Sequence, residues 1–387
     1  MRREGRATSS ATISRTREPA ALGTATARLL PASARDEAGA IWLELEARQG
    51  AGALTCSWVW TETWVRHYGD RVPHWFAIAE MEDEAVGAAL ITRGVSRKAG
   101  LPIRTLHFGT AGEPEDETVY VEFNRLLAPP DQRVTVAASI VRAIRTAKLG
   151  FDEWRLDGFV PADAHALAAA IPGLGPRVEA CRLVDLRALR DAGRTPLKAF
   201  SRNTIEKIGK NLRRFERDLG PISVQWAETT TQAHAIMAEL ADLHQARWTK
   251  AGKPGVFASK RFAQFHRDLI ERLLPDRIML LRVAAGDHTI GCLYGFIESG
   301  TLLSYQWGLA EFDNKRVAPG FVAAALAMQA ALDRGLDEWN WLSGDMLYKR
   351  ELSTGERPMV WASARASLRA LAVNGLVRLR DAVQSRG

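Results

Sequence analysis

The stretch Asn314-Lys-Arg-Val-Ala-Pro-Gly320 leads directly into an apolar, alanine-rich run over residues 321–332. Pro319 suits the first position of a helix, where its missing N–H costs nothing, and Gly335 suits the position just after a helix. The pattern therefore predicts a helix over residues 319–334.

Short apolar and aromatic segments flank this helix. Residues 302–307 precede it and residues 339–342 follow it, and both are short and bulky enough to be strands. The resulting order of strand, basic loop, helix and strand is typical of an α/β fold.

The start of the expected helix suits an anion. The first amides of a helix have no partner within it, and the helix dipole favours negative charge there. Glycine also lets the backbone approach a ligand closely. We therefore expect the amides of Gly320, Phe321 and Val322 to face a diphosphate, with Lys315 and Arg316 beside it.

Composition limits the classes of protein that fit. The 387 residues are 47% hydrophobic, which allows two ordinary domains with buried cores. No apolar run reaches the roughly 20 residues that span a bilayer. Residues 1–30 lack the apolar segment of a secretory signal, so we expect a disordered tail there; an organelle transit peptide is the alternative for this Arg- and Ser-rich composition.

Charge and cysteine usage point to a cytoplasmic protein with an acidic partner. The net charge of +7 is typical of proteins that bind a phosphorylated cofactor, a sugar nucleotide, nucleic acid or anionic lipid. The three cysteines are odd in number and far apart, as expected for reduced thiols. The eight histidines form no pattern of metal ligands, so no metal site is expected.

An internal repeat divides the chain. Residues 150–154 and 335–339 both read Gly-apolar-Asp-Glu-Trp, and each follows an alanine-rich helical run. Further upstream, residues 78–90 resemble residues 281–293, with a charged turn between two strands. Three matched landmarks in the same order predict two copies of one α/β unit.

The two copies are expected to have different roles. We place the first over residues 31–190 and the second over residues 191–364, with a terminal helix over residues 365–387. The first copy carries an acidic stretch over residues 112–117, and its helix follows Asp131, whose carboxylate would repel a diphosphate. It is therefore expected to be a cofactor-free scaffold or one wall of the acceptor site. His107 and Glu122 in this copy either face a cleft or are satisfied where they stand.

A basic helix is expected near residues 203–219. Its apolar residues recur at steps of three and four, and the opposite face is rich in cations. The cations on that face are Lys207, Lys210, Arg213, Arg214 and Arg217. Two interpretations stay open, a strip that binds nucleic acid or a phosphorylated acceptor, and a solvated face.

The motifs Lys315-Arg-Val-Ala-Pro-Gly320 and Gly344-Asp-Met-Leu-Tyr348-Lys349 resemble those of the GNAT acyltransferase superfamily. More narrowly, the chain resembles the tandem-GNAT group of bacterial cellulose and exopolysaccharide biosynthesis (CelD/BcsL type), which is related to the Fem-type aminoacyltransferases. The resemblance covers residues 34–364. It implies two tandem units, each with a mixed, mostly antiparallel twisted sheet and flanking helices.

The resemblance also implies an activity. It suggests an acyltransferase that moves an acyl group, most simply acetyl from acetyl-CoA, to an amine or hydroxyl of a small molecule, a sugar or a cell-envelope precursor. An aminoacyl-tRNA-dependent transferase of the Fem type is one alternative. A non-catalytic accessory module of polysaccharide synthesis is another.

The same resemblance assigns the expected site residues. Tyr348 is the expected acid for the leaving thiolate, Asp345 is the first candidate base, and His244 is the second. Each has a structural alternative, namely a backbone hydrogen bond, a helix cap and core packing. The expected acyl-CoA contacts are Lys315, Arg316, Val317, Gly320, Phe321, Val322, Trp307 and Gly308. The expected acceptor contacts are Lys349, Glu298, Tyr305 and Trp248.

Overall fold

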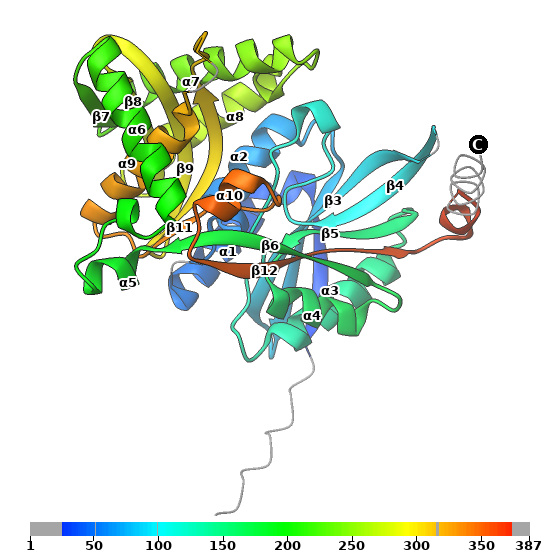
Figure 1. The fold of residues 1–387 in the computed structure, drawn as a ribbon. Coiled ribbons are helices and arrows are strands. Elements are labelled where there is room, and N and C mark those ends of the chain that lie inside the picture. The colour runs from blue at the N-terminus through cyan, green and yellow to red at the C-terminus, as the bar shows by residue number, and fades with distance from the viewer. Residues whose placement is uncertain (1–24, 51, 99, 315–316, 374–387) are drawn as a thin grey trace, which may run out of the picture.

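The computed structural model describes residues 25–50, 52–98, 100–314 and 317–373. Twelve strands of this part form one twisted sheet, in the order β1-β2-β3-β4-β5-β12-β6-β11-β10-β9-β8-β7 (Figure 1). Helices flank both faces, as expected for a mixed α/β fold. No helix in this part of the chain combines the length and apolar composition that crossing a bilayer requires.

The first unit runs from β1 to β6. Its elements are β1 (Thr26–Pro31), α1 (Arg35–Gln49), α2 (Trp58–Tyr68), β2 (His74–Met81), β3 (Glu84–Lys98), β4 (Leu101–Phe108), α3 (Arg133–Ala147), β5 (Glu153–Phe159), α4 (Pro161–Ala170) and β6 (Gly175–Asp185).

The second unit runs from α5 to β12. Its elements are α5 (Leu186–Asp191), α6 (Arg202–Leu219), β7 (Ile222–Trp226), α7 (Thr230–Lys250), α8 (Lys260–Leu273), β8 (Ile278–Ala285), β9 (His288–Glu298), β10 (Thr301–Leu309), α9 (Pro319–Asp333), β11 (Glu338–Asn340), α10 (Leu347–Glu351) and β12 (Gly355–Arg365).

The strand register confirms the internal repeat. In the first unit β4 and β5 are parallel and Thr105 pairs with Glu153. In the second unit β10 and β11 are parallel and Thr301 pairs with Glu338. The two Asp-Glu-Trp segments therefore begin equivalent strands.

The two units exchange their last strands. Strand β6 of the first unit pairs with β11 of the second, and β12 of the second unit pairs with β5 of the first. Strands β6 and β12 also pair with each other over Gly175–Leu183. The two expected sheets are thus fused into one, and separating the units would break main-chain hydrogen bonds on both sides of the junction.

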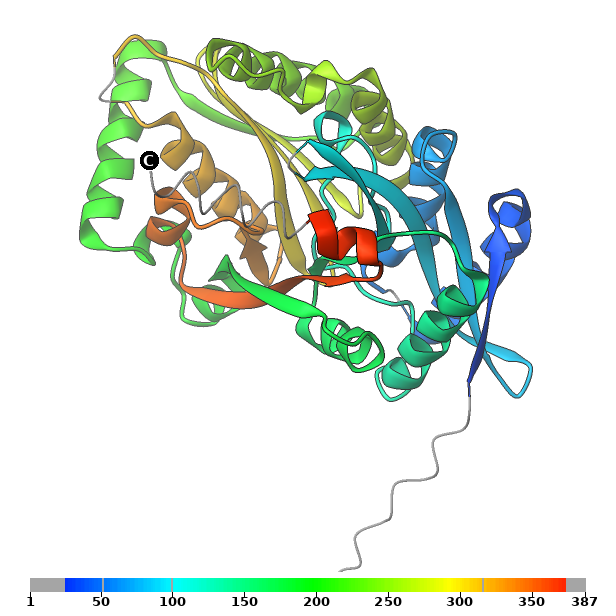
Figure 2. The same cartoon turned by 90° about the vertical axis from the view of Figure 1, so that its right-hand side faces the viewer.

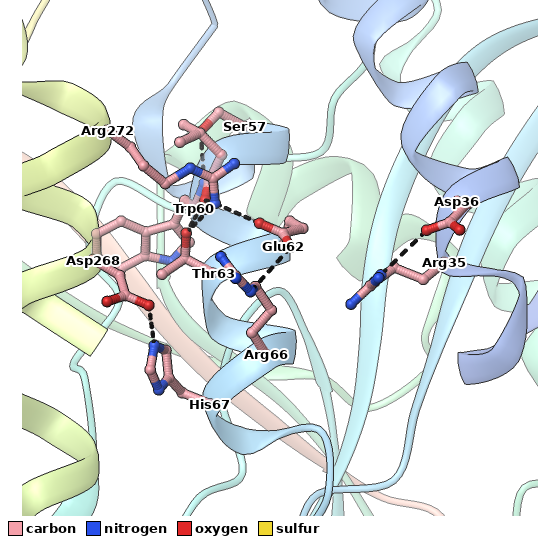
Figure 3. Close-up of polar contacts among 11 residues, drawn as sticks. Arg35, Asp36, Ser57, Trp60, Glu62, Thr63, Arg66, His67, Asp268 and Arg272 are labelled. Atoms are coloured by element: carbon pink, nitrogen blue, oxygen red, sulfur yellow. Dashed lines mark hydrogen bonds and ion pairs between the residues drawn. The ribbon is translucent and has the colours of Figure 1, made fainter. Parts of the chain in front are cut away.

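Helix packing joins the units a second time. Arg272 on α8 donates to the hydroxyl of Thr63 on α2 at 2.6 Å, and His67 lies 2.8 Å from Asp268 (Figure 3). Beside these contacts Trp60 packs edge-on against Phe265, with ring centroids 5.2 Å apart. One hydrophobic core therefore includes helices of both units.

The expected central helix is confirmed as α9, which ends before Gly335 in the left-handed conformation (φ 80°). The expected tail is corrected at its end, because residues 26–30 belong to β1, an edge strand that pairs with β2. Strand β12 extends to Arg365, so the terminal helix cannot begin there. Most of that helix, residues 374–387, lies outside the described residues, as do residues 1–24 of the tail.

Candidate functional site

A gap opens where β10 and β11 diverge. The two strands pair over only three residues, Thr301–Leu303 with Glu338–Asn340. Beyond that point the pairing of β10 with β9 is interrupted by a bulge between Ser304 and Gln306. After β11 the chain leaves β10 and continues along β6, since the backbone amide of Trp341 donates to the backbone carbonyl of Arg182 on β6. A cavity of about 170 Å³ lies in this gap, and we call it the splay cavity.

Both units line the splay cavity. The lining residues are Tyr120, Glu122, Ser304, Tyr305, Gln306, Trp307, Trp341, Leu342, Ser343, Tyr348 and Lys349. Four of the expected site residues are among them, namely Trp307, Tyr305, Tyr348 and Lys349. Tyr120 and Glu122 come from the first unit, as the scaffold-or-wall interpretation allowed.

Hydrogen bonds fix the aromatic walls of the cavity. The indole N–H of Trp307 donates to the Ser304 hydroxyl at 2.7 Å, and the Tyr305 hydroxyl donates to the carbonyl of Val119 at 2.5 Å. The ring of Tyr348 packs edge-on against Trp341, with centroids 5.7 Å apart. Burial raises the pKa of Tyr348, so its phenol stays neutral and can donate a hydrogen bond at physiological pH.

A carboxylate and an amine meet at the same loop. Glu122 accepts two hydrogen bonds from Ser343, at 2.8 Å from the amide and 2.5 Å from the hydroxyl. The ammonium group of Lys349 donates to the carbonyl of Ser343. Burial raises the pKa of Glu122 and lowers the pKa of Lys349, although each partially offsets the shift of the other. Removal from water thus disfavours both charges.

The two expected bases lie outside this cavity. Asp345 is exposed and forms a close ion pair with Arg350, which lowers its pKa. His244 is buried on α7 between Trp248 and Phe257, with ring centroids 5.7 and 5.1 Å away. Burial lowers the pKa of His244. Its surroundings match the packed-histidine alternative.

Three further expected residues are also separate from the cavity. Glu298 lines a second cavity of about 440 Å³, where its carboxylate accepts a hydrogen bond from the backbone amide of Leu54 at 2.8 Å. Trp248 is 37% exposed on α7. At Gly308 a Cβ atom would lie 2.5 Å from the carbonyl oxygen of Leu240, so this glycine allows α7 to pack on β10.

The start of α9 is partly engaged within the protein. The side-chain oxygen of Asn211 accepts a hydrogen bond from the backbone amide of Ala318 at 2.9 Å. The amides of Phe321 and Val322 both donate to the carbonyl of Ala318, and Val322 is fully buried. This corrects the expectation that three consecutive amides face an anion. Of these three amides, only that of Gly320 has no backbone acceptor among the residues that the structure describes.

Cations from α6 lie beside that helix start. Lys315 and Arg316 are outside the described residues, but the Lys207 ammonium lies 3.4 Å above the ring of Phe321. Figure 2 shows α6, in green, beside the orange α9. A hollow of about 390 Å³, here called the α6 hollow, is lined by Asn203, Glu206, Lys207, Lys210, Asn211 and Arg214. The sequence leaves two interpretations of this helix open, a strip that binds nucleic acid or a phosphorylated acceptor and a solvated face, and neither predicts that Lys207 packs on Phe321.

The corresponding gap in the first unit is filled by its own chain. Asn124 donates its side-chain amide to the carbonyl of Phe108 on β4 at 2.7 Å. Its backbone amide donates to Gly158 on β5 at 2.8 Å, and its carbonyl accepts from Val160 at 3.1 Å. The diverging ends of β4 and β5 are therefore bridged by protein.

Comparison with known proteins relates the second unit to the acetyltransferase fold. Residues 202–350, from α6 to α10, match the family model described as an acetyltransferase (GNAT) domain. Comparison with curated proteins gave no match.

Three solved structures resemble most of the chain. The first is the C-terminal domain (DUF2156) of an Agrobacterium fabrum protein named for lysylphosphatidylglycerol synthetase, with TM-score 0.54, 12% identity and coverage of 88% of this chain and 95% of that one. The second is FemX, with TM-score 0.52, 10% identity and coverage of 85% of this chain and 95% of that one. The third is L-PGS from Bacillus licheniformis, with TM-score 0.51, 12% identity and coverage of 88% of this chain and 95% of that one. At these identities the likeness concerns the fold alone.

Proposed function

We propose that the protein is an acyltransferase that moves an acyl group from acyl-CoA to an amine or hydroxyl in the splay cavity. One observation carries the proposal. Within the segment that matches the GNAT domain, the bulged β10 parts from β11 and opens a polar cavity, and the end of the same strand reaches the start of α9, where Leu309 lies against Gly320. Tyr348 and Lys349 both line that cavity.

The donor supplies an activated thioester, and the residues near α9 suit its phosphates. Acyl-CoA carries a diphosphate and a further phosphate, which cations and helix-start amides bind well. We propose Gly320, Lys210 and Arg214 as contacts for these groups. Neither Lys210 nor Arg214 has an ion-pair partner among the described residues. Lys315 and Arg316 remain proposed contacts from the adjoining loop.

The chain can assist the transfer at two points. Acyl transfer places negative charge on the thioester oxygen, and preorganised donors stabilise it. We assign this role to backbone amides at the bulge near Gln306. The Tyr348 phenol is the proposed donor to the departing thiolate, since it is neutral and Tyr348 lines the cavity.

The acceptor is proposed to be small or to present a small nucleophilic end. A space of about 170 Å³ lined by Glu122, Ser343 and Lys349 suits a polar group such as an amino sugar or another cell-envelope or exopolysaccharide precursor. Acetyl is the proposed acyl group because it leaves room for that acceptor.

A second candidate is an aminoacyl-tRNA-dependent transfer. It is favoured by the exposed α6 face, where Lys210, Arg213 and Arg214 have no ion-pair partner in the described part of the chain. Backbone phosphates of RNA would bind such a face with a steep dependence on salt. If the protein binds tRNA at low salt, and charge reversal at Arg213 and Arg214 abolishes this binding, the second candidate is preferred.

The principal experiment measures acetyl-CoA binding and thiol release. We expect acetyl-CoA to raise the melting temperature, and an acceptor panel of amino sugars, UDP-sugars and amino acids to include one that releases CoA. Lys210→Glu with Arg214→Glu should weaken acetyl-CoA binding at least tenfold. Arg217→Glu is the matched control, because Arg217 pairs with Asp218 and lies outside the α6 hollow. No stabilisation by acetyl-CoA or longer acyl-CoAs would overturn the proposal.

A further inference from the structure

Among the described residues, the only carboxylate that lines the splay cavity belongs to the first unit. Of the lining residues, Glu122 alone carries a carboxyl group, and none is a histidine or a cysteine. It lies 221 positions from its hydrogen-bond partner Ser343 in the sequence. The second unit, which contributes every lining residue except Tyr120 and Glu122, thus depends on the first for an acidic group.

The other titratable groups of the cavity are less suited to accept a proton. Lys349 uses its ammonium group to donate to the carbonyl of Ser343. Burial keeps Tyr305 and Tyr348 as neutral phenols. Glu122 accepts two hydrogen bonds from Ser343, but two carboxylate oxygens offer about four acceptor sites, so capacity for a further donor remains.

The position of Glu122 is held from two directions. Ser343 binds both of its oxygens from the side of the second unit. Two residues further along the chain, Asn124 bridges β4 and β5 in the first unit. The segment that fills the first unit's gap therefore also presents a carboxylate to the second unit's cavity.

We propose that Glu122 is the general base of acyl transfer, contributed by the first unit to the site of the second. This inference rests on the proposed acyltransferase function. The acceptor's N–H or O–H proton passes to the Glu122 carboxylate as the acceptor atom forms a bond to the acyl carbon. The carbon–sulfur bond breaks, and the thiolate takes a proton from Tyr348, which regains one from water. Glu122 releases its proton to solvent, so the enzyme returns to its starting state.

Substitution at Glu122 tests the proposal directly. We expect Glu122→Gln to lower kcat by about 100-fold or more, the usual effect of losing a general base, while acetyl-CoA stabilises the variant as it does the wild type. The rising limb of the wild-type pH profile should be absent from the residual activity. Glu115→Gln is the control, because Glu115 is exposed on the same segment and does not line the cavity. Its activity should match the wild type.

Ser343→Ala provides a second test if Glu122→Gln folds poorly. The hydroxyl of Ser343 favours the charged form of Glu122, so its loss should raise the pKa of Glu122 and move the rising limb to higher pH. A purely structural Glu122 would leave the limb in place. An active wild type with an equally active Glu122→Gln variant, or an unmoved limb in Ser343→Ala, overturns this inference alone. A wild type that neither binds acyl-CoA nor releases thiol overturns the proposed function as well.

Discussion

Asn124 donates its side-chain amide to the carbonyl oxygen of Phe108, 2.7 Å away, at the place where the equivalent strand of the second unit borders a cavity. The strand registers align Phe108 with Ser304, because each lies three residues beyond the matched residues Thr105 and Thr301. A duplicated fold has thus kept its gap open in one unit and filled it in the other. Under the proposed function, this difference leaves one transfer site to which both units contribute.

We expect Asn124→Ala to destabilise the protein by about 1–3 kcal/mol, because it leaves the buried carbonyl of Phe108 without its donor. Urea unfolding monitored by tryptophan fluorescence measures this change. Acetyl-CoA should bind the wild type and the variant with one molecule per chain. A second binding site in either protein would contradict the assignment of the first unit as filled.

The elements that were predictable from sequence are those marked by local signals. Helix α9 begins at Pro319 and ends just before Gly335. The proline marks the start of the helix and the glycine marks its end, and each acts within a few residues of the end that it marks. The exchange of β6 and β12 was not predictable, since the pairing of Cys181 with Arg357 joins positions far apart in the sequence. Strand β1 was missed because a short edge strand has little pattern of its own.

The site was predictable only in part for the same reason. Tyr348 and Lys349 belong to a recognisable motif next to the last strands, and the structure places them in the splay cavity. Glu122 lies in an irregular segment, so no helix or strand periodicity predicts which way its side chain points. Its partner Ser343 becomes a neighbour only after the two units have packed together. Such a pair has no signature in a single sequence.

Two glycines of the second unit should respond differently to substitution. At Gly308 an added Cβ would lie 2.5 Å from the backbone of Leu240, so Gly308→Ala should cost about 1–3 kcal/mol by forcing α7 away from β10. At Gly320 the nearest atom is a flexible methyl group of Leu309, 3.1 Å away, and alanine is the better helix former. Gly320→Ala should therefore be neutral or stabilising in thermal unfolding. Equal losses at both positions would contradict this account.

Glu113 should make the stability of the protein fall as pH rises through the neutral range. Burial raises the pKa of Glu113 to about 7, and one of its oxygens has no hydrogen-bond partner among the described residues. Between the unfolded pKa of about 4.5 and the folded pKa, the folded state holds a proton that the unfolded state has lost, so stability decreases with rising pH.

Replacing Glu113 by Gln should remove that dependence. At pH 8 the variant should be more stable than the wild type by on the order of 1–3 kcal/mol, and the difference should shrink towards pH 5. Thermal unfolding across this range measures it. Glu115→Gln is a suitable control, since Glu115 is exposed. A variant less stable than the wild type at pH 8 would show that the carboxylate is stabilised in the fold.

Lys349→Met should shift the pH dependence of activity without removing it. The positive charge of Lys349 lowers the pKa of Glu122, so its loss should leave Glu122 protonated to a higher pH. The rising limb of the rate profile should then move upwards, and activity near neutral pH should fall while recovering at alkaline pH. Arg350→Met is the matched control, because Arg350 pairs with the exposed Asp345 and does not line the cavity. A loss of activity that is the same at every pH would mean that Lys349 acts on the substrate itself and not through the charge of Glu122.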